Sequence, residues 1–479
     1  MRWFHVPGPT SSCPSYLPGL YTSEEIDDLV FVQGFIPVAS GAEFVKINTG
    51  AFETMGGGTC WSGNYTTGLS KKYVQVMPVD FTGILSIGFT PQSEFIYDGN
   101  EMGMANFQPT PSTSVSVHLF SSNLGYTARN MRMSNFTIDK LTGTKSGPFG
   151  GCGGTISNNF IFSSSITCTN ESSGLVSDAV TGCTITNCLV SLCTVSGSNV
   201  YGVVNGPATV SYTDVLNTTL TGTGRAGGIG ITENVSYCKF SGGSITAGSV
   251  GSGTGGINAS NAPGIIEYCV VENTTINANM SIVCGIGQAR GGATIRHNRI
   301  ENVNINVTGP RNRVGGISGL FFGGTNVVEQ NDVINCNISA PNSVDVGGII
   351  GYDQNLGTMR NNRVIGGTVH GSSRVGGLIG RISLGTTVCQ RSFSTAAITG
   401  GSLVGGAIGQ SVVNANTLEL YWDTVTSGNA TSAGGAQVIG QTTVALQAPV
   451  APTGIYASWS ALIWSFGTSN QYPSLINVP

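Results

Sequence analysis

The feature that most constrains the fold of this chain is a four-residue phrase that returns four times. Val-Gly-Gly followed by Ile, Leu or Ala begins at Val314, Val346, Val375 and Val404. The second glycines of these phrases are Gly316, Gly348, Gly377 and Gly406, so the spacings are 32, 29 and 29 residues. Weaker copies occur at Gly174, Gly202, Gly228, Gly256, Gly285 and Gly435. A period of this length predicts a solenoid of stacked repeats.

Between the glycine pairs, apolar residues recur in two columns. The first column is Val190, Val215, Phe240, Val271, Ile300, Val333, Val364 and Phe393. The second is Val195, Leu220, Ile245, Ile276, Ile305, Ile338, Val369 and Ile398. Short β-branched runs broken by Gly, Asn and Ser indicate strands and turns. The pattern predicts an all-β parallel β-helix of about ten coils with three short strands each, in which every coil buries its apolar face against its neighbours.

The repeats predict four segments. Residues 1–50 carry no repeat and are expected to be an irregular arm, an anchor or a packed cap, without the long apolar core of a signal peptide. Residues 51–130 are predicted to form an N-terminal cap and entry coils, and residues 131–440 the β-helix repeats. Residues 441–479 are predicted to be a C-terminal aromatic cap, with Trp422, Trp459 and Trp464 sealing the last coil.

Composition narrows the partners and cofactors. Charged residues make up only 9% of the chain and the net charge is −4, so no nucleic-acid partner is expected. No run reaches 18 apolar residues, so no membrane span is expected. The 12 cysteines form no CxxC pair and no zinc-like cluster, which favours buried free thiols and predicts neither metal nor cofactor. Cys238 and Cys269 stack in adjacent coils, and whether they form a disulfide is left open.

Segments at both ends of the repeats resemble a known family. Val79-Asp-Phe-Thr-Gly, Tyr97-Asp-Gly-Asn and Ala128-Arg-Asn-Met-Arg-Met-Ser-Asn-Phe-Thr-Ile precede the Val-Gly-Gly phrases, and Tyr421-Trp-Asp and Tyr472-Pro-Ser-Leu follow them. Their order resembles that of GLUG-motif repeat proteins over roughly residues 70–479. The resemblance implies a right-handed parallel β-helix in a surface-exposed protein, such as an adhesin or a large extracellular assembly. It implies no shared catalytic residues.

The arginine-rich stretch from Arg290 to Arg391 is the strongest candidate for a binding site. It holds ten arginines, no lysine and five acidic residues, so a groove for a polyanion or a sulfated glycan is one interpretation. The column alignment favours structural ladders instead, because acids and arginines alternate from coil to coil. The charge columns are Glu267, Arg296, Glu329 and Arg360; Arg299, Asp332 and Arg363; and Arg313, Asp345 and Arg374. Asn298, Asn331 and Asn362 form a further column that is predicted to hydrogen-bond along the stack.

No catalytic residues are predicted. Glycan cleavage uses two carboxylates about 5–9.5 Å apart, but the acids beyond residue 130 form no Asp-Asp or Asp-x-Asp group. The four histidines are scattered, and His297 is expected to face solvent because its parity is opposite to that of Asn298. N-x-S/T sequons at Asn64, Asn135 and Asn337 are candidate glycosylation sites.

These observations predict a non-catalytic structural or adhesive protein, extracellular or surface-exposed, which belongs to a filament or a virion exterior. The expected partners are further copies of the chain, other surface or assembly proteins, or glycans. The alternative is a carbohydrate-active enzyme, either a polysaccharide lyase or a glycoside hydrolase, or a glycan-binding module that uses a lateral groove.

Overall fold

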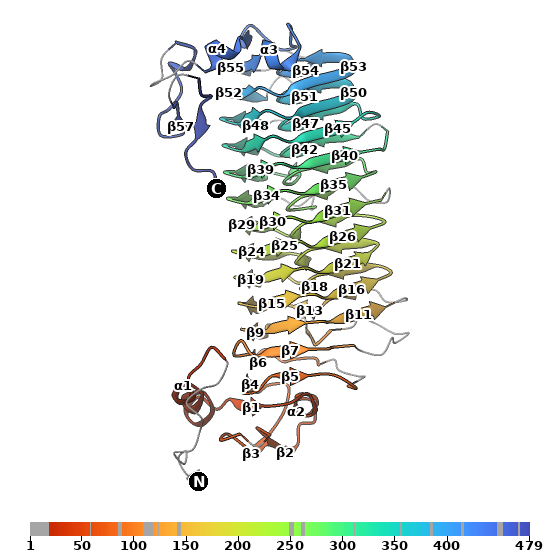
Figure 1. Ribbon diagram of the computed structural model, residues 1–479, viewed down its shortest axis with the longest axis vertical. Coiled ribbons are helices and arrows are strands. Elements are labelled where there is room, and N and C mark those ends of the chain that lie inside the picture. The colour runs from red at the N-terminus through yellow and green to blue at the C-terminus, as the bar shows by residue number, and fades with distance from the viewer. Residues whose placement is uncertain are drawn as a thin grey trace. The chain divides into compact units, whose positions relative to one another are not determined.

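The structure is a computed structural model that describes residues 19–57, 59–84, 89–108, 118–122, 124–140, 145–248, 253–259, 264–310, 312–354, 357–383, 387–412, 416–447, 454–467 and 470–479. The first 18 residues of the expected N-terminal arm lie outside the described residues. Parallel coils stack into an all-β solenoid of about 11 turns, which confirms the predicted parallel β-helix. The chain divides into two compact units, Met1–Val195 with Val204–Ala208 and Ser196–Val203 with Thr209–Pro479. Within each unit, the strands of successive coils lie one above another (Figure 1).

A coil of the second unit contains five short strands. Those of one coil are β38 (Thr294–Arg296), β39 (Arg299–Glu301), β40 (Asn304–Val307), β41 (Arg313–Gly315) and β42 (Ser318–Phe322). They pair in parallel with β43 (Asn326–Glu329), β44 (Asp332–Ile334), β45 (Asn337–Ala340), β46 (Asp345–Gly347) and β47 (Ile350–Asp353) of the next coil. The first two strands, the next two and the fifth belong to three different sheets. Three strands per coil were predicted, but each of these coils has five strands. The number three applies instead to the sheets in which these strands lie.

Single residues in the left-handed region bend the chain between the short strands. Asn302 between β39 and β40 has φ of 53°, and Asn335 in the next coil has φ of 50°. Asparagine tolerates this conformation better than most residues, since its short side chain can hydrogen-bond locally. The many asparagines of the sequence are thus partly explained by the corners of the coils.

The apolar columns form the core of the second unit. Ile338 is paired with Ile305 on one side and Val369 on the other, and all three are almost fully buried. The column that contains Val333 and Val364 follows the prediction until its last member. There the prediction is wrong, because Val364 is paired with Ser394, and Phe393 is paired with Arg363. Since neighbouring strand residues face opposite ways, Phe393 points away from the core column.

The repeat glycines form one continuous stack. A Cβ atom at Gly316 would overlap the carbonyl oxygen of Gly348, and a Cβ at Gly348 would overlap that of Gly377. Backbones of successive coils approach too closely at this turn for any side chain. The same relation holds at Gly202, Gly228, Gly256, Gly285 and Gly377. At the last position, Gly406, the space is filled by the ring of Trp422.

Replacing Gly348 by alanine is expected to destabilise the protein by about 1–3 kcal/mol, as overpacking does elsewhere. Chemical denaturation followed by circular dichroism measures the loss. Gly103 is the matched control, because a Cβ there would meet nothing within 4 Å. Equal stability of the Gly348→Ala and Gly103→Ala variants would contradict the close stacking of coils.

The N-terminal segment of the first unit is a packed cap from residue 19 onward. It contains α1 (Ser23–Asp27), a π-helical turn (Asp28–Val32), β1 (Ile36–Val38) and α2 (Gly41–Lys46), followed by the hairpin of β2 (Phe52–Met55) and β3 (Gly63–Thr66). β1 pairs in parallel with the entry strand β4 (Lys72–Gln75), which in turn pairs with β6 (Ile96–Asp98). Phe44 of α2 contacts the rings of Phe81 and Phe120 within the core. Of the three expectations for this segment, residues 19–50 therefore match the packed cap, because a strand and a helix join them to the coils.

The C-terminal segment covers a lateral face of the second unit. After β55 (Asn416–Asp423) come α3 (Thr424–Ser427), β56 (Val438–Gln441), α4 (Thr443–Leu446), β57 (Trp464–Ser465) and β58 (Ser474–Leu475). Trp422, which is paired with Ser394, fills the end of the core column as predicted. Trp459 and Trp464 instead pack against the outward-facing ring of Phe393. The two tryptophans thus do not seal the end of the coil but protect an apolar patch on its side.

Candidate functional site

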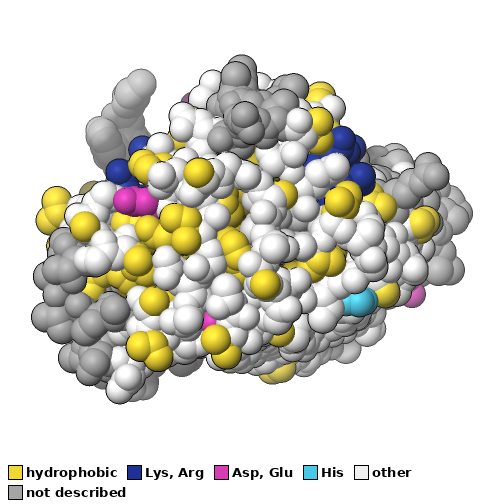
Figure 2. Space-filling view, turned by 90° about the horizontal axis from the view of Figure 1, so that it is seen from above, with side chains coloured by type: hydrophobic (Ala, Val, Ile, Leu, Met, Phe, Trp, Pro, Cys, Tyr) yellow, Lys and Arg dark blue, Asp and Glu magenta, His cyan; other side chains and the backbone are white. Residues whose placement is uncertain are grey.

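Charged side chains are few on the surface, and Lys and Arg gather in small patches among uncharged groups (Figure 2). In the second unit, the strand register aligns the predicted charge columns. Glu267 of β33 (Ile265–Glu267) is paired with Arg296, and Arg296 with Glu329. Glu329 is in turn paired with Arg360 of β48 (Gly357–Arg360). In the second column, Asp332 lies between Arg299 and Arg363 of the neighbouring coils. In the third, Asp345 is paired with Arg313 and contacts Arg374.

Each acid in these columns forms its ion pair with the arginine of the following coil. Glu267 binds Arg296 at 2.8 Å, and Glu329 binds Arg360 at 2.6 Å. Asp345 binds Arg374 at 2.5 Å and Asp332 binds Arg363 at 2.7 Å. The first arginine of the second column does not bind the acid that follows it, since Arg299 lies 3.8 Å from Glu301 of its own strand. The predicted alternation is therefore present, but it resolves into separate pairs instead of continuous ladders.

The pair of Asp332 and Arg363 is largely buried. The Asp332 side chain is 1% exposed and the Arg363 side chain 12%. Both nitrogens of one guanidinium edge donate to the two carboxylate oxygens at 2.7 Å. The Arg363 Nη1 also donates to the carbonyl oxygen of Pro473 at 2.8 Å, so the C-terminal segment covers this pair.

The asparagine column forms a hydrogen-bonded ladder inside the coils. The Asn298 side-chain amide donates to Oδ1 of Asn331, and that of Asn331 donates to Oδ1 of Asn362, both at 3.0 Å. The backbone N–H groups of Asn298 and Asn331 donate to the same acceptors. All three side chains are fully buried. The ladder satisfies buried polar groups from coil to coil, which is a structural role.

An aromatic stack, which the sequence reasoning missed, lies on the outside next to this column. The rings of Tyr212, Tyr237, Tyr268 and His297 are parallel, with centroids 4.9, 4.8 and 4.7 Å apart. Each residue has a positive φ and directly precedes a buried residue, which is Thr213, Cys238, Cys269 or Asn298. His297 was expected to face solvent, but it is 8% exposed. Its burial, together with the neighbouring Arg296, lowers the pKa of the imidazole below its usual value.

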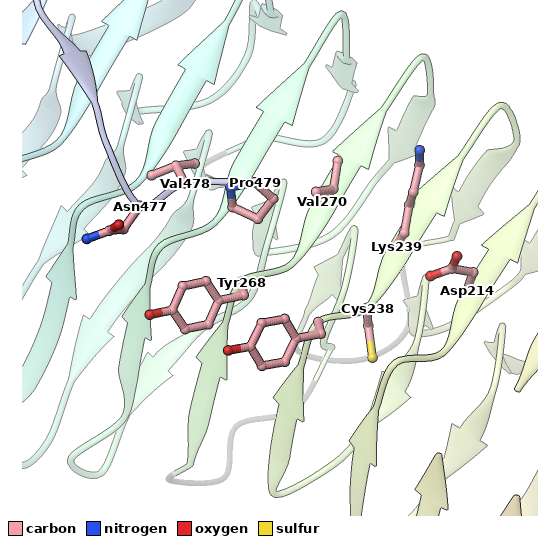
Figure 3. Close-up of a pocket in the computed structure, with 9 residues that line it drawn as sticks. Asp214, Cys238, Lys239, Tyr268, Val270, Asn477, Val478 and Pro479 are labelled. Atoms are coloured by element: carbon pink, nitrogen blue, oxygen red, sulfur yellow. The ribbon is translucent and has the colours of Figure 1, made fainter. Parts of the chain in front are cut away.

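A pocket of about 540 Å³ lies beside this stack and is lined by the C-terminal residues Asn477–Pro479. Tyr268, Lys239, Asp214 and Cys238 line it from the coils (Figure 3). Lys239 donates to Glu272 of the next coil at 2.6 Å. Burial raises the pKa of the Asp214 carboxyl, and Lys239 opposes that shift. The pocket therefore combines aromatic edges with a carboxyl group, which suits a small polar ligand such as a sugar.

The remaining sequence candidates are accessible or satisfied in the structure. The sequon residues Asn64, Asn135 and Asn337 are all exposed, and Asn337 donates to Asn304 at 3.0 Å.

Cys238 and Cys269 are free and buried, as are the eight other free cysteines of the described chain, whereas Cys60 is disulfide-bonded. Among the described residues, no three His, Cys, Asp or Glu side chains gather in a way that could hold a metal ion. The helices in the described part of the chain are all too short or too polar to cross a membrane.

The fold and these contacts define a capped parallel β-helix whose coils are joined by stacked side chains. Comparison with known proteins found no matching family model and no similar curated protein. The resemblance to GLUG-motif proteins stays a prediction that rests on the motifs quoted above.

Proposed function

We propose that this chain is a non-catalytic structural or adhesive surface protein whose lateral faces contact assembly partners or glycans. The observation that carries this proposal is the pairing of the repeat acids. Glu267, Glu329, Asp332 and Asp345 each bind an arginine at 2.5–2.8 Å. In each pair the carboxylate oxygens already accept hydrogen bonds from a guanidinium of the next coil, which links the two coils. The repeated polar residues thus hold coils together.

An extracellular or surface-exposed location belongs to the same proposal. The disulfide at Cys60 supports it, since disulfides persist mainly in oxidising compartments. Buried free thiols elsewhere in the chain are shielded from that environment. A filament or a virion exterior would provide the repeated partners that a stack of similar coils can contact.

The second candidate, a carbohydrate-active enzyme, is favoured only by the pocket beside the aromatic stack. Its acid would be Asp214, the carboxyl group that lines the pocket and whose pKa is raised by burial. A raised pKa is what a general acid requires. Paired carboxylates are also needed for hydrolysis, and Glu272 already binds Lys239.

A glycan array combined with a reducing-end assay on acidic and neutral polysaccharides separates the two candidates. The structural proposal predicts no increase in reducing ends above that of a protein-free sample. Asp214→Asn is the diagnostic variant for any activity that is seen. Release of reducing ends by the natural chain, and its loss in Asp214→Asn, would overturn the proposal in favour of the enzyme.

A further inference from the structure

Three arginines of the second unit, Arg290, Arg313 and Arg381, lie against aromatic rings instead of acids. Arg290 ends β37 (Ala289–Arg290) and its guanidinium lies 5.1 Å from the ring centroid of Phe322. Arg313 and Arg381 lie 4.8 and 5.1 Å from the ring of Tyr352. We call these five residues the arginine–aromatic strip.

The strip spans four successive coils in two columns that lie two residues apart, because Leu320 and not Phe322 is paired with Tyr352. Arg290 is paired with Phe322, and Tyr352 with Arg381 of β51 (Ile379–Ile382). Arg313 comes from the coil before Tyr352 and Arg381 from the coil after it, so the ring is covered from both neighbouring coils. Stacking fixes the plane of a guanidinium while leaving its N–H edge free to donate. The arginines are therefore positioned before any ligand arrives.

Asp345 offsets part of the charge on these guanidiniums, since Arg381 and Arg313 both oppose the rise that burial causes in its pKa. No ion pair joins Arg290, Arg313 or Arg381 to a described acid, and the Nε atoms of Arg290 and Arg381 are buried without a hydrogen-bond partner. Asp345 is the acid paired in register with Arg313, but it binds Arg374. Burial, and after it the nearby Arg313 and Arg225, lower the pKa of Arg290. A partly exposed cluster in which three unpaired arginines outnumber the nearby acid favours an anion.

We propose that the arginine–aromatic strip binds an acidic polysaccharide that runs along the stack of coils. Arg290 and Arg381 are three coils apart, about 14 Å at the usual strand spacing. One small anion cannot reach both, so the ligand carries repeated charges. Guanidinium groups bind sulfate and carboxylate groups through paired N–H donors. This inference names a ligand class for the proposed surface protein and rests on that proposal.

Nucleic acid is the other polyanion that carries repeated charges. Single strands bind through bases stacked on open aromatic faces, but Tyr352 is 8% exposed and its ring is covered by two arginines. A net charge of −4 also opposes attraction of a nucleic acid to the chain as a whole. The strip therefore favours a polysaccharide.

Isothermal titration at low and physiological salt tests the strip, with heparin as the sulfated probe and polygalacturonate as the carboxylate probe. The natural chain is expected to bind at least one of them, and which one it binds distinguishes sulfate from carboxylate recognition. The triple variant Arg290→Gln, Arg313→Gln, Arg381→Gln should bind at least about 100-fold more weakly, since one charged hydrogen bond contributes about tenfold. The matched control changes Arg132, Arg296 and Arg360 to Gln, removes the same charge and should stay within about threefold.

A second variant keeps the test decisive if the triple variant does not fold. Asp345→Asn preserves the shape of the side chain and frees Arg374, so binding should become several-fold tighter. Equal binding by the triple variant and its control would overturn the inference, as would unchanged binding by Asp345→Asn. Absence of binding to both probes, or equally tight binding to duplex DNA through the same arginines, would also overturn it. Release of reducing ends would overturn the non-catalytic proposal alone, so the two failures are distinguishable.

Discussion

Replacing Ile338 by aspartate is expected to lower the free energy of unfolding by at least about 4 kcal/mol. Ile338 is 1% exposed and is paired with Ile305 and Val369 in the coils on either side. An aspartate there would be a charge without a partner in an apolar column, or would have to bind a proton to stay inside. Denaturant unfolding followed by circular dichroism measures the change. The loss should exceed what ordinary surface substitutions cause.

The adjacent residue supplies a matched control. Asn337 lies on the same strand but is exposed, because neighbouring strand residues face opposite ways. Asn337→Asp should cost about 1 kcal/mol or less, the value of the hydrogen bond that its amide donates to Asn304, since a carboxylate can still accept from Thr368. If Ile338→Asp were as stable as Asn337→Asp, the register of the core would be contradicted.

The core could be predicted from the sequence because a β-helix places equivalent residues of successive coils in direct contact. Aligning Ile305, Ile338 and Val369 in the sequence therefore also aligns them in space. The same reasoning failed at Phe393, since it assumed that an apolar residue near the expected position faces inward. Phe393 faces outward and is covered by Trp459 and Trp464, which lie outside the repeats. No periodicity within the coils signals such a cover.

Among the candidate sites, too, some features could be predicted from the sequence and others could not. The alignment of the charge columns and the asparagine ladder follow from register and were predicted, whereas the choice of one arginine by each acid was not. The stack of Tyr212, Tyr237, Tyr268 and His297 had a signal in the sequence, because the four rings recur at the coil period, each directly before a buried small or amide residue. The pocket had none, since Asn477–Pro479 reach it from beyond the last coil. Similarly, the choice of Asp345 between Arg313 and Arg374 depends on side-chain packing around Tyr352.

Replacing Asp332 by alanine is expected to destabilise the protein by about 3–5 kcal/mol, which is the usual cost of breaking a buried ion pair. Its side chain is 1% exposed and receives two hydrogen bonds from Arg363. The alanine variant would leave the Arg363 guanidinium, 12% exposed, without its carboxylate partner. Thermal and denaturant unfolding should both report the loss.

Glu329→Ala provides the comparison that separates burial from ion pairing. Glu329 and Arg360 join the same two coils as Asp332 and Arg363, but the Arg360 side chain is 48% exposed. Water can solvate that arginine when the glutamate is removed, so the loss should be about 1 kcal/mol or less. It should also shrink at high salt, because exposed charges are screened within about 10 Å at 0.1 M salt. The loss in Asp332→Ala should depend little on salt, since solvent does not reach the pair. If Asp332→Ala and Glu329→Ala lost equal stability, or if both losses depended equally on salt, burial would not determine how much these ion pairs stabilise the fold.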